Sequence, residues 1–424
     1  MRSFRFNMLN NYVCCVDIGS SKIAAVLAEI ERKSISNIYF ESIQSAGIRN
    51  GMVVDSIELV NAVSLLLKKL KAISGINIKF VYTNVSGQEI ATKHARAVIP
   101  LAERGNKVIT LSDIHKVNDQ ARILGSSLED EIIHLIPHSY SLDAKQDIIN
   151  PLGLYSHRLE VDLYLICVKL SCVQNLSRVI NQAGYEIKEL FFSGLAGSRV
   201  ALDKELQEGF NLFCDIGSDI TELLLFKNDR LWDVQILPVG GDNLTAQLQN
   251  KLKIPFALAE EIKRSHGIIG SLDEIKQDKE ILIKDNDFYK PIKQRAVLEI
   301  ITPSARSICN IIKETVEKKL PSCEINNFII AGDCVLLEGF IEILENTLNI
   351  PVGLARIENP AIPASVKERQ ELSGRKYLTY LTCLGMLCEA LRDKTELIIS
   401  KQKPSFNPVF NALNRFKELY QEYF

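Results

Sequence analysis

The chain has 424 residues, of which 46% are hydrophobic and 24% are charged, and its formal net charge is −2. This length exceeds what one hydrophobic core supports, so we expect two or more domains. The near-neutral charge lacks the basic excess of nucleic-acid-binding domains, which excludes nucleic acid from the expected partners.

Targeting and redox signals point to the cytoplasm. The N-terminus has no apolar core of the kind that a secretion signal needs, and no run of 18 apolar residues predicts a membrane-spanning helix. The ten cysteines form no CxxC pair and lie mostly in apolar runs, which indicates buried free thiols in a reducing compartment. Any membrane contact is therefore expected to be peripheral.

The first predicted elements form a β-hairpin. A strand over Tyr12–Val16 ends in Asp17, the chain passes Gly19, and a second strand returns over Ile23–Ile30. Glycine lets the backbone approach an anion, turn amides point at phosphate oxygens, and the carboxylate suits Mg²⁺ through water. The hairpin predicts a phosphate site, although one copy alone is more typical of an ordinary Asp-Gly turn.

The segment between this hairpin and a second one predicts an α/β domain with an insertion. Residues 86–165 behave as an inserted unit, and the elements after it lead back to the first domain. The predicted elements are a helix Ile57–Ile73, a strand Lys79–Ser86, the inserted strands His94–Ile99 and His134–Leu142 with a helix Ser112–Leu124, a strand Leu159–Lys169, a helix Cys172–Ala183, a strand Ile187–Phe192 and a bridging helix Gly197–Leu206.

The second hairpin repeats the phrase Asp-Ile-Gly-Ser of residues 17–20 at residues 215–218. Its predicted strands are Asn211–Cys214 and Glu222–Phe226, and its acid is Asp215. Two copies of one phosphate-type turn favour a nucleotide clamp over two unrelated turns.

The second half then predicts a turn at Gly240 and Gly241 that enters a helix capped by Asp242 or Asn243. Residues 246–322 read as helical and charged. A strand Asn327–Ala331 ends at Gly332 and Asp333 close to a ligand, and helices follow over Leu337–Leu348 and Tyr377–Arg392.

One pair in the charged region has two interpretations. Glu260 and Lys263 lie three residues apart on one helical face, so the carboxylate would accept ribose hydroxyls while the lysine stem covers adenine. An ordinary surface ion pair explains the same spacing. The order of the pair among the other motifs supports the nucleotide interpretation.

The C-terminal tail predicts an amphipathic helix. A polar linker, residues 393–407, ends at Asn407 as helix cap and is followed by Pro408 at the first helical position. The helix, residues 408–424, either docks on its own domain or lies in a membrane interface, and the linker favours the membrane. The predicted membrane residues are Val409, Phe410, Leu413, Phe416, Tyr420, Tyr423 and Phe424.

In this order the motifs resemble the actin, Hsp70 and sugar-kinase superfamily of ATP-binding proteins, and within it the FtsA family of bacterial cell-division proteins. The narrower resemblance rests on five segments besides the tail and the inserted unit: VDIGSSKI at 16–23, IPHSY at 136–140, NPLGL at 150–154, SGLA at 193–196, and the run from Ala259 to Gly267.

The resemblance implies an α/β, actin-like two-lobed fold, with two RNase H-like domains around a nucleotide cleft and an FtsA-type inserted subdomain. It divides the chain into domain 1A (1–85 and 166–197), subdomain 1C (86–165), domain 2A (198–245 and 323–392), subdomain 2B (246–322), the linker and the terminal helix. The cofactors that it implies are ATP and Mg²⁺. The implied nucleotide residues are Asp17, Gly19, Ser20, Ser21, Lys22, Asp215, Gly217, Ser218, Gly240, Gly241, Glu260, Lys263, Gly332 and Asp333, with Asp17 and Asp215 holding Mg²⁺ through water.

The family resemblance also implies partners and a location. These are polymerisation with further copies of the chain, the C-terminal peptide of the tubulin-like protein FtsZ bound at subdomain 2B, other division proteins, and the cytoplasmic face of the inner membrane at the division site. The family's Glu-Pro-Arg stretch in 2B reads Thr302-Pro303-Ser304 here, with Glu299, Arg295 and Arg306 as nearby candidates for the peptide contact.

Two departures bear on catalysis. Where the family usually has Asp-Ile-Gly-Gly-Gly-Thr, this chain has Asp215-Ile216-Gly217-Ser218-Asp219-Ile220, so two glycines are replaced and an extra carboxylate faces the phosphate side. Ser193 stands where Hsp70-like relatives carry a glutamate that orients water. We therefore expect slow or absent ATP turnover, and assign no catalytic residue.

Two other functions fit the same superfamily. A small-molecule kinase needs a catalytic aspartate and a substrate pocket, neither of which can be assigned, and it has no use for an amphipathic tail. An actin-like pilus-assembly ATP-binding adaptor shares the fold but usually lacks such a tail.

Overall fold

The two predicted hairpins each begin a five-stranded sheet. A computed structural model describes residues 12–31, 34–102, 105–143, 145–202, 209–271, 280–285, 288–320 and 325–396. The chain divides into unit 1, from residues 1–196, 361–366 and 382–424, and unit 2, from residues 197–360 and 367–381. The predicted tail helix and most of the linker lie outside the described residues.

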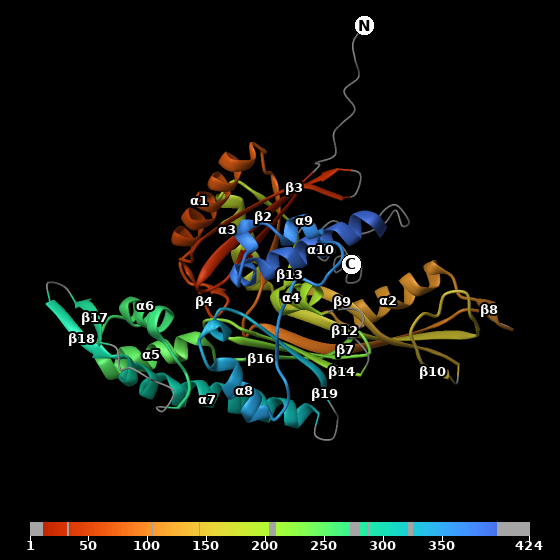
Figure 1. Cartoon of the computed structure of the whole chain (residues 1–424). Helices are drawn as coiled ribbons and strands as arrows, with labels where there is room; N and C mark the ends of the chain where they lie inside the picture. Colours follow the sequence, from red (N-terminus) through yellow and green to blue (C-terminus); the bar gives the residue numbers. More distant parts are fainter. Residues whose placement is uncertain are drawn as a thin grey trace, which may run out of the picture. The chain divides into compact units, whose positions relative to one another are not determined.

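The unit 1 sheet has the order β13-β6-β1-β2-β3. Figure 1 labels three of these strands, β13, β2 and β3. Strand β2 pairs antiparallel with both β1 and β3, whereas β6 pairs parallel with β1 and β13 pairs parallel with β6. Consecutive residues are buried along β1 and β2, so both faces of these strands are covered, which explains their nearly continuous hydrophobic runs. The strands are β1 (Tyr12–Ile18), β2 (Lys22–Glu31), β3 (Ser34–Gln44), β6 (Phe80–Val85) and β13 (Glu186–Phe192).

Helices cover this sheet. Helix α1 (Ser56–Ser74) begins where the Asp55 carboxylate accepts hydrogen bonds from the amides of Ile57 (2.9 Å) and Glu58 (3.0 Å), and it ends at Gly75. It contacts β2, β3 and α3 (Leu170–Gln182). Helix α10 (Leu381–Glu396) lies over β1 and β2, where the Cys383 thiol donates to the carbonyls of Cys15 and Ala24.

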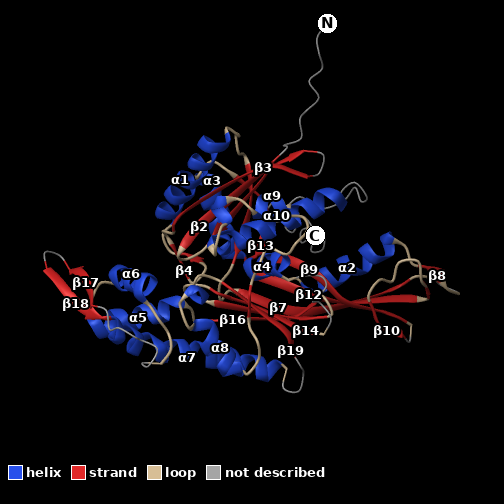
Figure 2. Cartoon of the chain, in the orientation of Figure 1, coloured by secondary structure: helices blue, strands red, loops and turns tan. Residues whose placement is uncertain are grey.

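The inserted segment forms an antiparallel sheet in the order β10-β9-β12-β7, with one helix on it. In Figure 2 its three long strands are drawn as red arrows beside α2. Apolar side chains of β7, β9, β12 and α2 make a separate hydrophobic core. The elements are β7 (Ile90–Pro100), α2 (Leu111–Gly125), β9 (Asp130–Leu142), β10 (Lys145–Ile148) and β12 (Arg158–Lys169), with short pairs β8 (Lys107–Val108) and β11 (Tyr155–Ser156), and β4 (Ile48–Arg49) and β5 (Met52–Val53) outside the insert.

Unit 2 repeats the arrangement of the first sheet. Its order is β16-β15-β14-β19-β20. Strand β15 pairs antiparallel with both β14 and β16, whereas β19 pairs parallel with both β14 and β20. The hairpin pairs match residue by residue, since Ile18 faces Ile23 and Ile216 faces Thr221. The strands are β14 (Phe210–Ile216), β15 (Thr221–Lys227), β16 (Arg230–Leu237), β19 (Ile325–Ala331) and β20 (Gly353–Leu354).

Two segments of unit 2 differ from the predicted helices. Residues 246–322, predicted to be helical and charged, also contain a hairpin of β17 (Glu280–Asp285) and β18 (Phe288–Lys293). A 3₁₀ turn, η3 (Cys334–Leu336), delays the next helix to Phe340. The helices are α5 (Gly241–Leu252), α6 (Phe256–His266), α7 (Gln294–Lys319) and α8 (Phe340–Leu348) and, with residues of both units, α4 (Ser193–Ala201) and α9 (Ala364–Lys367). In the described ranges, no helix is long and apolar enough to cross a membrane.

Candidate functional site

The turn of the first hairpin is held by its own backbone and by an asparagine that sequence reasoning missed. The Gly19 amide donates to the Lys22 carbonyl at 3.0 Å. Buried Asn84, at the end of β6, donates to the Asp17 carboxylate at 2.6 Å and accepts from the Ile18 amide at 2.7 Å. Asn84 therefore fixes the orientation of the predicted metal-binding acid.

Ser193 extends this chain of contacts. The Asn84 amide donates to the Ser193 hydroxyl at 2.8 Å, and that hydroxyl donates to the Val85 carbonyl at 3.1 Å. Ser193 is thus buried and engaged in holding Asn84. Ser20 and Ser21 lie in the turn, where the Ser20 hydroxyl accepts from the Gly51 amide and the Ser21 carbonyl accepts from the Ser45 amide.

The second hairpin has the same turn. The Gly217 amide donates to the Ile220 carbonyl at 3.0 Å, and an added Cβ at Gly217 would lie 3.1 Å from that oxygen, as one at Gly19 would from Lys22. The repeated phrase therefore produces the same local geometry in both units.

The tip of the second hairpin is joined to the start of α5. The Gly241 and Asp242 amides donate to the carbonyls of Gly217 (2.9 Å) and Ser218 (2.8 Å). Gly240 has room for no side chain, because a Cβ would lie 2.5 Å from the Ser218 oxygen. The helix cap is Gly240 itself, and the Asn243 side chain accepts from the Gly240 amide, so neither predicted cap residue is the cap.

Two carboxyl groups meet at this junction. Burial, followed by a hydrogen bond to Asp219 and the charge of Asp219, raises the pKa of Asp242 from 3.8 to about 7, against the opposing effect of Lys263. A hydrogen bond between two carboxyl groups requires a shared proton, so the pair holds the hairpin tip to α5 best while it is protonated.

The Asp219–Asp242 pair predicts a pH dependence of stability. Because the pKa of Asp242 is raised in the folded state, its contribution is fully present below pH 3.8 and is lost as the pH rises through about 7. We expect Asp219→Asn to be more stable than the wild type at pH 8, by on the order of 1–2 kcal/mol after solvent screening. Urea unfolding of both proteins between pH 5 and 9 measures this. An equally steep decline in the variant would show that the pair is not its cause.

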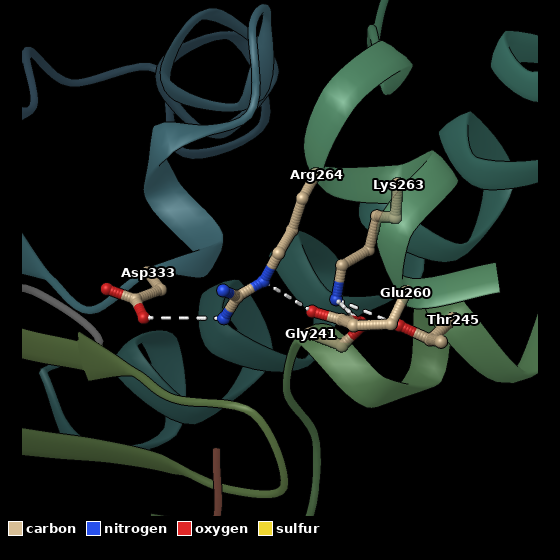
Figure 3. A network of polar contacts seen from close by, with 6 residues as sticks. All are labelled: Gly241, Thr245, Glu260, Lys263, Arg264 and Asp333. Carbon is tan, nitrogen blue, oxygen red and sulfur yellow. Dashed lines mark hydrogen bonds and ion pairs between the residues drawn. The ribbon is translucent and has the colours of Figure 1, made fainter. Parts of the chain in front are cut away.

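The predicted pair on α6 belongs to a network of six residues (Figure 3). The Lys263 ammonium donates to the Glu260 carboxylate (2.6 Å), the Thr245 hydroxyl (2.8 Å) and the Gly241 carbonyl (3.0 Å). The Thr245 hydroxyl donates to Glu260 at 2.5 Å. Burial alone would raise the pKa of Glu260, but the Lys263 charge and the hydrogen bonds of Lys263, Thr245 and Arg264 hold it below its usual range.

Burial changes the role assigned to Lys263. Its side chain is only 7% exposed, and its ammonium joins α6 to the first turn of α5. The exposed cation of the network is Arg264, which sequence reasoning missed: its Nε donates to Glu260 at 2.8 Å, and a terminal nitrogen lies 3.8 Å from an Asp333 carboxylate oxygen. The sequence offered one indication of this role, namely that Arg264 directly follows Lys263.

The turn at Gly332 lies against Asp215. Gly332 has φ +93°, and an added Cβ would lie 2.2 Å from the Ile216 carbonyl oxygen and 2.7 Å from an Asp215 carboxylate oxygen. Asp333 follows and contacts Arg264. Unit 2 thereby brings together Asp215, Gly217, Ser218, Gly240, Gly241, Glu260, Lys263, Gly332 and Asp333, whereas Asp17, Gly19, Ser20, Ser21 and Lys22 lie in unit 1. Over the described ranges, no group of three or more His, Cys, Asp or Glu has a metal-binding arrangement.

Two segments of the chain match protein-family models. The family model described as "SHS2 domain inserted in FTSA" matches residues 87–167, and the model described as "Cell division protein FtsA" matches residues 212–381. The chain belongs to the FtsA family. Similarity to the FtsA of Borreliella burgdorferi is 27% identity over 352 residues, which covers 82% of this chain and 85% of that protein. This confirms the predicted family and its role in cell division.

Solved structures confirm the predicted actin-like fold of this FtsA family member. A chain of a PilM-PilN type IV pilus biogenesis complex has a TM-score of 0.64 at 17% identity, covering 89% of this chain and 98% of that one. MreB5 of Spiroplasma citri, solved bound to AMPPNP, has a TM-score of 0.50 at 11% identity, covering 92% and 99%. At these identities the likeness concerns the fold alone.

Proposed function

We propose that this chain is an ATP-binding, actin-like scaffold that polymerises and tethers FtsZ filaments to the cytoplasmic face of the membrane at the division septum. The observation that carries the nucleotide part is the pair of matching hairpins, each with an acid, a glycine turn and the same backbone hydrogen bond. Membership of the FtsA family supports the division role.

The proposed nucleotide residues are those predicted from the sequence. The hairpin turns would receive phosphate, the α6 network would receive the nucleoside, and Asp17 and Asp215 would hold hydrated Mg²⁺, which offsets phosphate charge when bound. The fit is supported at Gly332, where only a glycine lets the backbone lie against the Asp215 carboxylate. Asn84 would keep Asp17 in its orientation.

The proposed FtsZ-peptide surface is subdomain 2B, residues 246–322. Arg295 and Glu299 lie on α7 with half-exposed side chains and form an ion pair at 3.5 Å, so both are accessible to a peptide. Thr302 is buried and its hydroxyl accepts from the Gly270 amide at 3.3 Å, which gives it a structural role instead.

The proposed membrane anchor is the helix 408–424. One such helix binds weakly, and a polymer carries many, so attachment becomes stable through multivalency. This design suits a scaffold better than a kinase. Electron microscopy of the protein with vesicles, with and without ATP, tests nucleotide, polymer and anchor together, and a failure to form filaments on vesicles with ATP would contradict the proposal.

The anchor gives a prediction of its own. Deleting residues 408–424 is expected to abolish co-sedimentation with anionic vesicles, because the apolar face of the tail supplies the binding. A matched pair sharpens the test: Leu413→Gln on the apolar face should weaken binding, whereas Asn414→Gln on the polar face should not. Unchanged sedimentation of the deletion variant would rule out the tail as anchor.

A further inference from the structure

One histidine of the insert reaches the sheet that carries the first hairpin. His134 lies on β9, and its ring nitrogen Nε2 accepts a hydrogen bond from the Phe192 amide at 2.9 Å. Strand β9 contacts β13, whose last residue is Phe192 (Figure 1). Because Phe192 is fully buried, its amide needs an acceptor within the protein, and a side chain of the insert supplies one.

A β-bulge in β9 lies directly beside His134. Ile166 and Cys167 are neighbours on β12, the strand across from it. They pair with His134 and Ile132 respectively, so Ile133 is an extra residue in β9. An extra residue bends its strand and re-aims the side chains beside it, and such bulges recur next to functional sites. The bulge accounts for the reach of His134 beyond its own sheet.

The histidine contact lies one residue away from a series of hydrogen bonds that ends at Asp17. Ser193 follows Phe192 as the first residue of α4, and its hydroxyl accepts from the Asn84 amide at 2.8 Å. The same amide donates to the Asp17 carboxylate at 2.6 Å, while the Asn84 oxygen accepts from the Ile18 amide at 2.7 Å. Ser193 and Asn84 are both buried, and close packing transmits a displacement of the backbone at residues 192–193 to them.

We propose that His134 is a positioning residue of the nucleotide site, which fixes the backbone at residues 192–193 and, through Ser193 and Asn84, the orientation of Asp17. This inference rests on the proposed function, in that Asp17 holds hydrated Mg²⁺ beside the phosphates. Side chains that orient a metal-binding group from behind matter for affinity, and their loss typically lowers it about 10–100-fold. The insert thus contributes to nucleotide binding through contacts within the protein.

Two substitutions separate the acceptor of His134 from its volume. His134→Leu removes the acceptor, whereas His134→Gln places an amide oxygen the same number of bonds from Cα as Nε2, where it can accept from Phe192. In calorimetric titrations of the full chain, we expect His134→Leu to weaken ATP about tenfold in the presence of Mg²⁺. Its ATP affinity in EDTA should equal that of the wild type, because Asp17 acts on the phosphates through the cation. His134→Gln should stay within about twofold of the wild type with Mg²⁺.

The same contacts have a readout in the protein without nucleotide. Hydrogen exchange of the Ile18 amide reports its bond to Asn84, so His134→Leu should speed this exchange about tenfold, and His134→Gln should not. The matched control is Val161→Ala, which opens a cavity in the separate hydrophobic core of the insert and leaves His134 in place. It should change neither the exchange at Ile18 nor the affinity for ATP with Mg²⁺.

Three outcomes of the titrations overturn the inference. These are an unchanged affinity in His134→Leu, an equal loss in His134→Leu and His134→Gln, which would assign the effect to the shape of the ring, and an equal loss in Val161→Ala, which would assign it to the stability of the insert. If the wild-type chain binds no ATP, the proposed function itself fails. Exchange at Ile18 then decides the positioning role separately, and an unchanged rate in His134→Leu contradicts it.

Discussion

Lys263→Met is expected to destabilise unit 2 by about 3 kcal/mol, near the low end for breaking a buried ion pair, because Glu260 is still partly exposed. Methionine keeps most of the volume but none of the three hydrogen bonds. It leaves the Glu260 carboxylate without its closest cation and the Gly241 carbonyl without its lysine donor. The free energy of unfolding in urea, followed by a probe in unit 2, measures the loss.

A double variant separates the ion pair from general packing. In Lys263→Met with Glu260→Gln, no buried charge is left uncompensated, so we expect part of the loss to be recovered. Lys251→Met, which changes an exposed lysine of α5, should stay within about 0.5 kcal/mol of the wild type. A loss as small as this control in Lys263→Met would mean that the network does not stabilise the junction of α5 and α6.

The hairpins were predictable because their information is local. An acid, a glycine and flanking apolar runs specify strand, turn and strand within about fifteen residues, and both copies fold with the same turn hydrogen bond. Helix α1 was predictable for the same reason. Its buried apolar residues recur at helical spacing within one short segment, which ends at Gly75.

The residues that organise the site could not be predicted in this way. Asn84 meets Asp17 across 67 positions, and Thr245 meets Glu260 across 15. A single asparagine or threonine carries no sequence signal for such a role, because the partner is chosen by strand order and helix packing. Asp219 illustrates the same limit: its sequence context suggests charge directed at phosphate, whereas its side chain is hydrogen-bonded to Asp242.

The hairpin β17–β18 was missed for a different reason. Its residues, 280–293, alternate charged and apolar positions weakly and lie between long helical patterns, so the helical period dominates any window that includes its neighbours. The start of α5 shows the converse. Asp242 and Asn243 are both good cap residues, but the cap lies two and three positions before them, at Gly240, where a side chain would collide with the Ser218 carbonyl.

Gly332→Ala is expected to cost about 2–4 kcal/mol and to displace the end of β14, because the new Cβ meets backbone that cannot rotate away. Two effects add: the positive φ of +93°, and the approach to Ile216 and Asp215. Gly184→Ala separates them, since Gly184 has φ +94° and nothing within 4 Å of an added Cβ. We expect that control to cost about 1 kcal/mol from backbone strain alone.

The measurement is the protection of backbone amides against hydrogen exchange, followed at β19 for Gly332→Ala and at β13 for Gly184→Ala. Equal losses of protection would mean that backbone strain explains everything and that the closeness of Gly332 to Asp215 is incidental. A larger loss at Gly332 would locate the constraint at its contact with Ile216 and the Asp215 carboxylate. In that case nucleotide affinity should fall in Gly332→Ala and stay unchanged in Gly184→Ala, because only the first moves the acid proposed to hold hydrated Mg²⁺.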